Sequence, residues 1–281
     1  MIILHGSDFQ VGKPHLRHVA QAFLEFARAL APDLVVIAGD LTQRARVAEF
    51  REARSVLDAL APTPVVVTPG NHDVPLYRFW ERLVAPYVNW RRFVGRDLDT
   101  VTRVAGATVV ALNSSAPRRA IVGGRVDAPQ VALARQAFQD AEPGEARILV
   151  VHHHFLPTAD GFGGRPLPGA EDLLRAFETM GVDLILGGHV HQTHLRTSRD
   201  LIAGPGEGIP LVTCGTTASS RGRGPEAGRN TLNVIRLGAD GVEVVPHGFD
   251  LDRGSFVPGP ARMFPGRARS PAAGVHGGGD A

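Results

Sequence analysis

The chain has 281 residues, of which 43% are hydrophobic and 21% are charged, and its formal net charge is +2. This length and composition predict one large globular domain with a substantial core, and they exclude a disordered, collagen-like or coiled-coil protein as an overall description. All of the net positive charge comes from residues 254–281, so the body of the chain is neutral and gives no strong nucleic-acid signal.

Three segments at the start of the chain share one pattern. Residues 2–8, 34–40 and 64–73 each place a short apolar run before small residues and a polar side chain. Between them, residues 17–30 and 44–60 repeat apolar residues at three- and four-residue steps, which predicts helices. Strands that alternate with helices pair in parallel, so the first part of the chain predicts a parallel sheet with helical crossovers.

The second half of the chain is predicted to add further strands and two helices. The predicted helices are residues 129–141 and 170–180. The predicted strands are residues 100–104, 108–113, 147–151, 183–186, 194–197, 209–214, 231–237 and 242–247. A parallel part followed by a more antiparallel part predicts two packed sheets in a single domain, residues 1–253. Residues 254–281, rich in Gly, Pro, Ala and Arg, are predicted to form a disordered tail.

The sequence also predicts where the protein works. Its longest apolar runs, such as residues 65–67 and 148–151, are far shorter than the roughly 20 residues that a membrane-spanning helix needs. The start of the chain lacks a basic region followed by a long apolar stretch, so we expect a cytoplasmic protein without a membrane span. Cys214 is the only cysteine, which excludes an internal disulfide and a thiolate metal cluster within one chain.

Five separated segments end an apolar run in side chains that can bind a metal. They are Asp8-Phe9-Gln10, Gly39-Asp40, Gly70-Asn71-His72-Asp73, His152-His153-His154 and Gly188-His189-Val190-His191. Ligand-binding side chains of parallel sheets lie beyond the carboxyl ends of the strands, so we expect these segments to meet. Alternate residues of a strand share a face, which predicts that Asp8 and Gln10 point at one site, as do His189 and His191.

The mixture of donors in these segments indicates which metals they bind. Carboxylate and amide oxygens combined with imidazole suit Mn, Fe or Zn rather than Ca or a thiolate-bound ion. More than six candidate ligands are too many for one ion. We therefore expect two divalent metal ions bridged by a shared carboxylate.

The motifs G-D, G-N-H-D and G-H-x-H, in this order, resemble those of the calcineurin-like metallophosphoesterase superfamily, and the chain resembles its bacterial cyclic-nucleotide phosphodiesterase-like branch from about residue 1 to residue 247. The resemblance implies an α/β fold, a four-layer α/β/β/α sandwich of two mixed sheets. It implies a first metal held by Asp8, Gln10, Asp40 and His191, with Asp40 as the bridge. It implies a second metal whose shell is completed by Asn71, His152 and His189.

The resemblance also assigns two catalytic residues. His72 is implied to face the phosphate and to protonate the leaving oxygen, and Asp73 is implied to lie behind it as its orienter. Gln10 departs from the family, most of which has histidine there. A glutamine oxygen is a weaker, neutral metal ligand than imidazole. We expect the first metal to bind more loosely or to be a harder ion, and complete loss of that site is the alternative.

Several positions leave more than one interpretation open. His152 is favoured as a ligand because it directly follows a predicted strand, with His153 as the alternative. His15 is predicted to be a structural residue, although it lies near enough to Gln10 to replace the missing imidazole. Residues 75–93, rich in aromatic side chains, are predicted to pack in the core rather than to stack on bases. Arg221 is either a substrate contact or part of an Arg-bearing surface loop.

The resemblance implies a metal-dependent phosphoric ester hydrolase, a phosphodiesterase that acts on a small phosphodiester by attack of a metal-bridging hydroxide. A hydrolase of nucleotide-diphosphate lipids, of the UDP-2,3-diacylglucosamine type, is one alternative, with residues 75–93 as an apolar lid. A non-catalytic scaffold with a partly decayed metal site is another, and Gln10 is the one observation in its favour. The sequence leaves the native substrate and the oligomeric state open.

Overall fold

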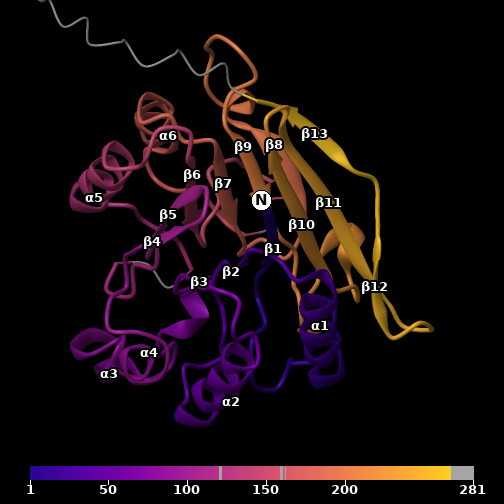
Figure 1. Ribbon diagram of the computed structural model, residues 1–281. Helices are drawn as coiled ribbons and strands as arrows, with labels where there is room; N and C mark the ends of the chain where they lie inside the picture. The colour runs from indigo at the N-terminus through magenta and orange to yellow at the C-terminus, as the bar shows by residue number, and fades with distance from the viewer. Residues whose placement is uncertain (120–121, 159–160, 162, 267–281) are drawn as a thin grey trace, which may run out of the picture.

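The computed structural model describes residues 1–119, 122–158, 161 and 163–266. Two mixed sheets form the centre of the molecule, and helices cover their outer faces (Figure 1). The first sheet has the order β12-β11-β10-β1-β2-β3, with β13 paired to β11. Its strands are β1 (Ile2–Gly6), β2 (Leu34–Ile37), β3 (Val65–Val67), β10 (Thr231–Gly238), β11 (Gly241–Asp250), β12 (Ser255–Pro258) and β13 (Arg262–Pro265). The strands β1, β2 and β3 pair in parallel, as the alternation of strands and helices predicts.

The second sheet has the order β4-β5-β6-β7-β9-β8. Its strands are β4 (Thr100–Val104), β5 (Ala107–Leu112), β6 (Ala146–Val151), β7 (Leu184–Gly187), β8 (His194–Thr197) and β9 (Pro210–Thr213). The strands β5, β6, β7 and β9 are parallel, while β4 and β8 pair antiparallel at the two edges. Each sheet therefore combines a parallel centre with antiparallel strands.

Burial along the strands shows why the sheets pack in layers. In β2, Leu34 and Val36 contact the core between the sheets, whereas Val35 and Ile37 contact the core beneath the helices. In β6, Ile148 and Val150 also face the core between the sheets, and their neighbours face the other side. Both faces of these strands are buried, which is typical of parallel sheets covered by helices.

The helices complete the outer two layers. They are α1 (Arg17–Leu30), α2 (Val47–Asp58), α3 (Phe79–Val84), α4 (Val88–Phe93), α5 (Ala128–Gln139) and α6 (Ala170–Thr179). Side chains of α1 and α2 pack on the first sheet, and side chains of α5 and α6 pack on the second. The predicted four-layer α/β/β/α sandwich is confirmed. No helix of the described residues is long and apolar enough to cross a membrane.

The helix predicted over residues 44–60 is shorter in the structure. It begins at Val47 because the Glu49 carboxylate accepts hydrogen bonds from the backbone N–H groups of Arg44 and Arg46, at 2.8 and 3.1 Å. Ala45 between them has a positive φ of 54°, which no α-helix contains. The residues before Val47 therefore form a turn.

The expectation of a disordered tail from residue 254 is wrong for residues 254–266. The strands β12 and β13 both pair antiparallel with β11 and extend the first sheet. Phe256 and Phe264 are 5% and 3% exposed, so two short strands bury aromatic rings within a segment rich in Gly and Pro. The two-sheet unit thus continues past residue 253, and residues 267–281 lie outside the described part of the chain.

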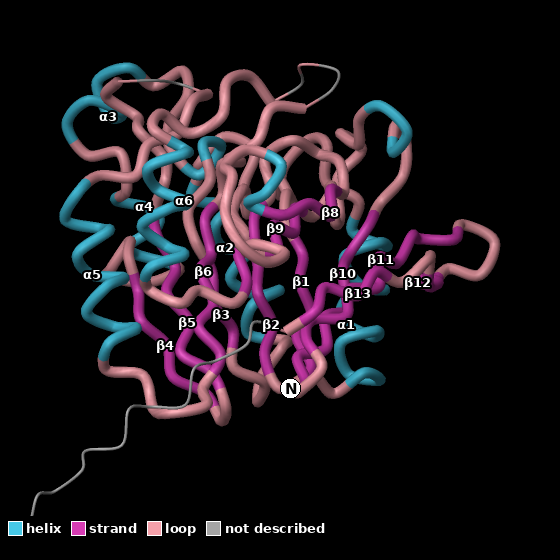
Figure 2. The backbone as a smooth tube through the Cα atoms, turned by 90° about the horizontal axis from the view of Figure 1, so that it is seen from above, coloured by secondary structure: helices cyan, strands magenta, loops and turns pink. Residues whose placement is uncertain are grey.

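The loops that follow the parallel strands of the first sheet lie at one end of the sandwich. In Figure 2 the N-terminus lies at one end of the strands, and long loops gather at the opposite end, where β1 and the strands parallel to it finish. The segments that follow β1, β2, β3, β6 and β7 contain all the predicted metal-binding residues. The topology therefore brings residues from widely separated parts of the sequence to one place.

Candidate metal centre

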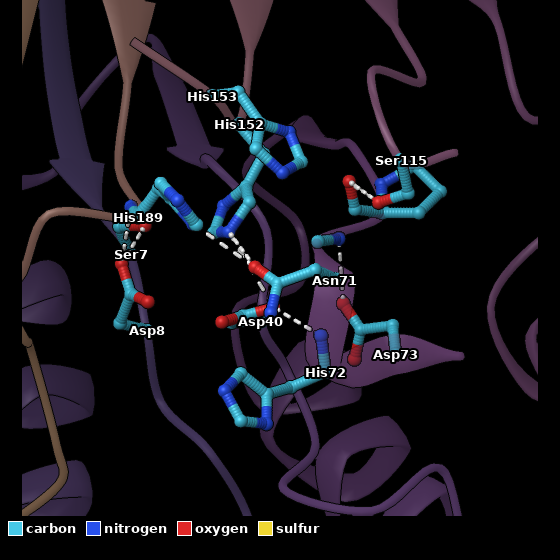
Figure 3. A network of polar contacts seen from close by, with 12 residues as sticks. Ser7, Asp8, Asp40, Asn71, His72, Asp73, Ser115, His152, His153 and His189 are labelled. Carbon is cyan, nitrogen blue, oxygen red and sulfur yellow. Dashed lines mark hydrogen bonds and ion pairs between the residues drawn. The ribbon is translucent and has the colours of Figure 1, made fainter. Parts of the chain in front are cut away.

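The seven side chains predicted to bind metals lie together beyond the strand ends, and each is at most 7% exposed. Asn71 Oδ1 lies 2.9 Å from His189 Nδ1 and 3.3 Å from His152 Nε2. His152 Nε2 lies 3.5 Å from Asp40 Oδ1. Figure 3 shows these four residues and Asp8 around a common centre. Donor atoms from five segments thus form one cluster.

Asp8, Asp40 and His191 each place one ligand atom within 4.8 Å of the others. Asp8 Oδ2 accepts hydrogen bonds from Ser7 Oγ at 2.6 Å and from the His189 backbone N–H at 3.0 Å. Asp8 Oδ1 is buried and accepts no hydrogen bond from the described residues. It lies 3.1 Å from His191 Nε2. A buried carboxylate oxygen without a hydrogen bond, beside other donors, fits a bound cation.

Each of the three clustered histidines has one ring nitrogen against a backbone carbonyl. His152 Nδ1 lies 2.7 Å from Ala38 O, His189 Nε2 lies 2.9 Å from Gly163 O, and His191 Nδ1 lies 2.8 Å from Arg221 O. A nitrogen that faces a carbonyl carries a proton, so in the neutral ring the other nitrogen presents its lone pair. In all three residues that second nitrogen faces the cluster, which is the arrangement of metal-binding histidines.

The same criterion separates His152 from its neighbours. His153 Nδ1 lies 2.8 Å from Ser114 Oγ, and its Nε2 lies 3.0 Å from Val122 O, so both of its ring nitrogens have partners away from the cluster. The geometry favours His152 over the alternative His153. The sequence leaves His15 as an alternative ligand in place of Gln10. Its Nδ1 lies 2.8 Å from Phe9 O, and Gln10 is the residue that lies against His191.

Backbone conformation at the site corrects one prediction. Asp8, Gln10, Asp40, His189 and His191 all have positive φ angles, between 46° and 74°. They lie in left-handed turns outside the strands, so strand alternation does not bring the members of each pair together. This conformation is unfavourable for side chains other than glycine and is typical of functional sites. The backbone N–H groups of Asp8 and Gln10 hold the turns in place by hydrogen bonds to Gly39 O and Asp40 O, at 3.1 and 2.9 Å.

Glycines keep the cluster tight at two points. A Cβ atom on Gly70 would collide with Asp40 Oδ1 and the Asp40 backbone nitrogen. A Cβ atom on Gly39, whose φ is 91°, would collide with the His152 ring. Only glycine lets the loops after β2 and β3 approach the ligand side chains so closely.

Buried charges set the protonation of the ligands at the site, and they do so differently for Asp40 and His189 than for His152 and His191. Burial by itself would raise the pKa of Asp40, but His152 and His72 hold it well below its usual range, so the carboxylate is ionised. Burial, together with the nearby His152, lowers the pKa of His189 to about 3, so this imidazole is neutral. An ionised carboxylate and a neutral imidazole are the forms that bind metals.

Burial by itself would lower the pKa of His152 and His191, but Asp40 raises the pKa of His152 to about 9, and Asp8 raises the pKa of His191. A cation that binds these two imidazoles therefore displaces a proton from each.

The structure corrects the predicted relation between His72 and Asp73. The Asp73 carboxylate accepts hydrogen bonds from the backbone N–H groups of Gly70, Leu41 and Thr42, at 2.9, 3.2 and 2.8 Å. His72 Nδ1 lies instead 3.1 Å from Gln43 O. Asp73 therefore joins the loops after β2 and β3, and the carbonyl of Gln43 orients the His72 ring. Burial raises the pKa of Asp73 to about 7.

A cleft of about 1020 Å³ opens above the cluster. His72 and Asn71 line it together with five cationic side chains, namely Lys13, Arg44, Arg46, Arg221 and Arg223. Arg221 Nη1 lies 3.0 Å from His72 Nε2 and 3.3 Å from Gln43 Oε1. The structure thus places Arg221 in the cleft rather than on an unrelated surface loop. The sequence signal for it was the Thr- and Ser-rich segment that precedes it.

The aromatic segment 75–93 does not pack in the core throughout, as the sequence predicted. Trp90 is 2% exposed and contacts Phe50. Tyr77, Phe79 and Trp80 are 75%, 52% and 76% exposed. The short helix α3 contains no buried residue, and of these three rings Tyr77 lines the cleft.

Comparison with known proteins agrees with this geometry. The chain is 27% identical over 249 residues to a cAMP/cGMP dual specificity phosphodiesterase of Mycobacterium tuberculosis. The aligned residues cover 83% of this chain and 72% of the relative. It is 28% identical over 171 residues to a probable cyclic nucleotide phosphodiesterase of Synechococcus sp., with coverage of 59% of this chain and 60% of the relative.

Solved structures share the fold at low sequence identity. A purple acid phosphatase from yellow lupin (Lupinus luteus) seeds matches 92% of this chain and 52% of its own, with a TM-score of 0.66 and 12% identity. A dimetal phosphatase of Danio rerio matches 88% of this chain and 95% of its own, with a TM-score of 0.55 and 14% identity. The family model for calcineurin-like phosphoesterases matches residues 1–193. The chain therefore belongs to the calcineurin-like phosphoesterase family.

Proposed function

We propose that this protein is a metal-dependent phosphoesterase that hydrolyses a small phosphodiester. One observation carries the proposal. Three buried imidazoles each place one nitrogen against a backbone carbonyl and turn the other toward Asp8, Asp40 or Asn71. Burying so many polar and charged groups costs folding free energy, and apolar side chains would fill the same space without that cost. A bound metal gives these buried donors a function. The phosphodiesterase names of two bacterial relatives support a phosphodiester substrate.

The proposal assigns two groups of ligands that share Asp40. Asp8, Gln10, Asp40 and His191 would hold the first metal. Asp40, Asn71, His152 and His189 would hold the second. Two divalent cations held in this way activate water near neutral pH and neutralise the phosphoryl oxygens of the substrate. Mn, Fe and Zn all suit this mixture of oxygen and imidazole donors.

Cationic side chains of the cleft bind the substrate in this proposal. The guanidinium groups of Arg44, Arg221 and Arg223 line the space above the ligands, so phosphoryl oxygens that enter it meet hydrogen-bond donors of opposite charge. Arg221 is the nearest of them to His72, and it moves its Nη1 donor from His72 Nε2 to the phosphoryl group when substrate enters.

His72 acts as the proton donor to the leaving oxygen. Its Nδ1 proton is directed at Gln43 O, which leaves Nε2 facing the cleft. Once Arg221 bonds to the substrate, Nε2 is free to take up a proton and pass it to the departing alkoxide. A group in this role typically accelerates a reaction by about 10²–10⁴-fold.

A second candidate is hydrolysis of a nucleotide-diphosphate lipid. The exposed ring of Tyr77, which lines the cleft, and the exposed rings of Phe79 and Trp80 in the same segment favour it, since acyl chains need apolar surface near the reacting phosphate. The sequence predicted that these rings pack in the core. Had they done so, they could not contact an acyl chain, and the lipid hydrolase would not be a candidate.

The test is hydrolysis by purified protein reconstituted with Mn²⁺. We expect turnover of bis-p-nitrophenyl phosphate. A panel of phosphomonoesters, cyclic nucleotides and nucleotide-diphosphate lipids then identifies the class of substrate. A marked preference for the lipid, lost on Trp80→Ala, would replace the leading proposal with the second candidate. Absence of turnover with Mn²⁺, Fe²⁺ and Zn²⁺ would favour the non-catalytic scaffold.

A further inference from the structure

The side chain of Gln10 has a second polar partner that the ligand assignment does not use. Gln10 is fully buried, and one end of its amide, at the Nε2 position, lies 3.2 Å from His191 Nε2 and 3.5 Å from Asp40 Oδ2. The other end, at the Oε1 position, lies 3.1 Å from Ser219 Oγ. The oxygen and nitrogen of an amide have nearly the same size, so hydrogen bonding decides which end faces which neighbour.

Ser219 belongs to a short series of buried hydroxyl groups. Its Oγ lies 2.6 Å from Thr216 Oγ1, and Thr216 Oγ1 lies 2.8 Å from the backbone carbonyl of Asp8. Thr216 is 0% and Ser219 is 1% exposed. Both residues also accept hydrogen bonds from Asn230 Nδ2 through their carbonyl oxygens, which holds this loop against the site.

Counting protons along this series settles the direction of each hydrogen bond. A carbonyl oxygen only accepts, so the single hydroxyl proton of Thr216 goes to Asp8 O. Thr216 Oγ1 then has lone pairs alone to offer, and the single hydroxyl proton of Ser219 goes to it. Ser219 Oγ consequently faces Gln10 without a proton. If the amide oxygen stayed there, two buried acceptors would meet with no proton between them, which is unfavourable.

We propose that Thr216 and Ser219 are positioning residues that turn the Gln10 amide so that its nitrogen donates to Ser219 Oγ and its oxygen faces Asp40 and His191 as a metal ligand. An amide nitrogen has no lone pair for a cation, whereas the oxygen is a ligand. The two hydroxyl groups thus orient the ligand atom of Gln10 toward the metal, as a backbone carbonyl orients the ring of each clustered histidine. This inference rests on the proposed metal centre.

The experiment is a calorimetric titration of metal-free protein with Mn²⁺. We expect Ser219→Ala to weaken binding at the first site by about 10-fold, the lower end of the range for groups that orient metal ligands. Thr216→Val should weaken it as well, because Ser219 would regain a free proton and draw the amide oxygen away from the metal. Ser220→Ala, which changes an exposed serine next along the chain, is the matched control and should leave the affinity unchanged.

A second background separates orientation from general damage to the loop. Gln10→Glu places an oxygen at both ends of the side chain, so the hydroxyl pair no longer decides what faces the metal. In that background Ser219→Ala and Thr216→Val should change the Mn²⁺ affinity less than twofold. The melting temperature of each metal-free variant checks that it folds.

Two results would overturn the inference. One is an unchanged Mn²⁺ affinity in Ser219→Ala, and the other is an equal loss with and without Gln10→Glu. Failure of the proposed function would look different, because the unmodified protein would then bind no Mn²⁺ in the same titration.

Discussion

The two sides of the ligand cluster are built differently. On one side, His152 directly follows β6, and Asn71 and His189 lie within a few residues of the ends of β3 and β7. On the other side, Gln10 contacts Ser219, and His191 contacts the carbonyl of Arg221. Carbonyls of Ala38 and Gly163 hold the rings of His152 and His189, whereas the second set contacts the loop that contains Ser219 and Arg221. Backbone carbonyls are present whatever the side chain, but a hydroxyl is not, so the Gln10 side should be the more sensitive to side-chain substitutions in that loop.

The largest effect is expected from Asp40→Ala, because Asp40 contacts both sides. Its Oδ1 lies 3.5 Å from His152 Nε2, and its Oδ2 lies 3.5 Å from Gln10 Nε2. We expect loss of both metal equivalents and no detectable turnover, measured by elemental analysis and by hydrolysis of bis-p-nitrophenyl phosphate. Asp58→Ala, at an exposed ion pair, is the control. Two retained equivalents would show that Asp40 is not the bridge.

His189→Ala should abolish metal binding at the second site and leave the first site intact. Its Nδ1 lies 2.9 Å from Asn71 Oδ1, on the side away from Gln10. We expect one of the two proposed metal equivalents to be lost and the activity to disappear, since in the proposed centre both cations would act on the phosphoryl group. The exposed His18→Ala serves as the control. Loss of both equivalents together would mean that the two sides do not bind independently.

His72→Ala tests a residue that belongs to neither side. Turnover of esters with poor leaving groups should fall by about 10²–10⁴-fold, whereas esters with good leaving groups should be affected much less. The metal content should stay the same. An equal loss for both kinds of ester would remove His72 from the role of proton donor.

Gln10→His should have the smallest effect and in the opposite direction. Imidazole is a stronger ligand than an amide oxygen, so we expect Mn²⁺ to bind the first site more tightly, by about 10-fold. The titration should leave the second site unchanged, which would confirm that the two sides differ. If neither affinity changes, Gln10 does not contact a metal.

Much of this molecule follows from periodicity along the sequence. The helix expected over residues 17–30 and the strand expected over residues 194–197 have those bounds in the structure. The seven candidate ligands lie in five segments that follow apolar runs, and the resemblance to the calcineurin-like family singled them out from the other polar side chains there. The strands β12 and β13 were missed because each has four residues and lies among Gly, Pro and Arg.

The sequence by itself determined most of the helices and strands, because buried faces repeat with the period of the helix or strand that carries them. The four layers and the candidate ligands were implied by the resemblance of its motifs to a known family. Only the tertiary structure decided that Asp73 joins two loops, that Trp80 is exposed while Trp90 is buried, and that Ser219 faces Gln10. Such contacts join segments far apart in the chain, and a local pattern does not encode which hydrogen-bonding groups meet after the sheets have packed.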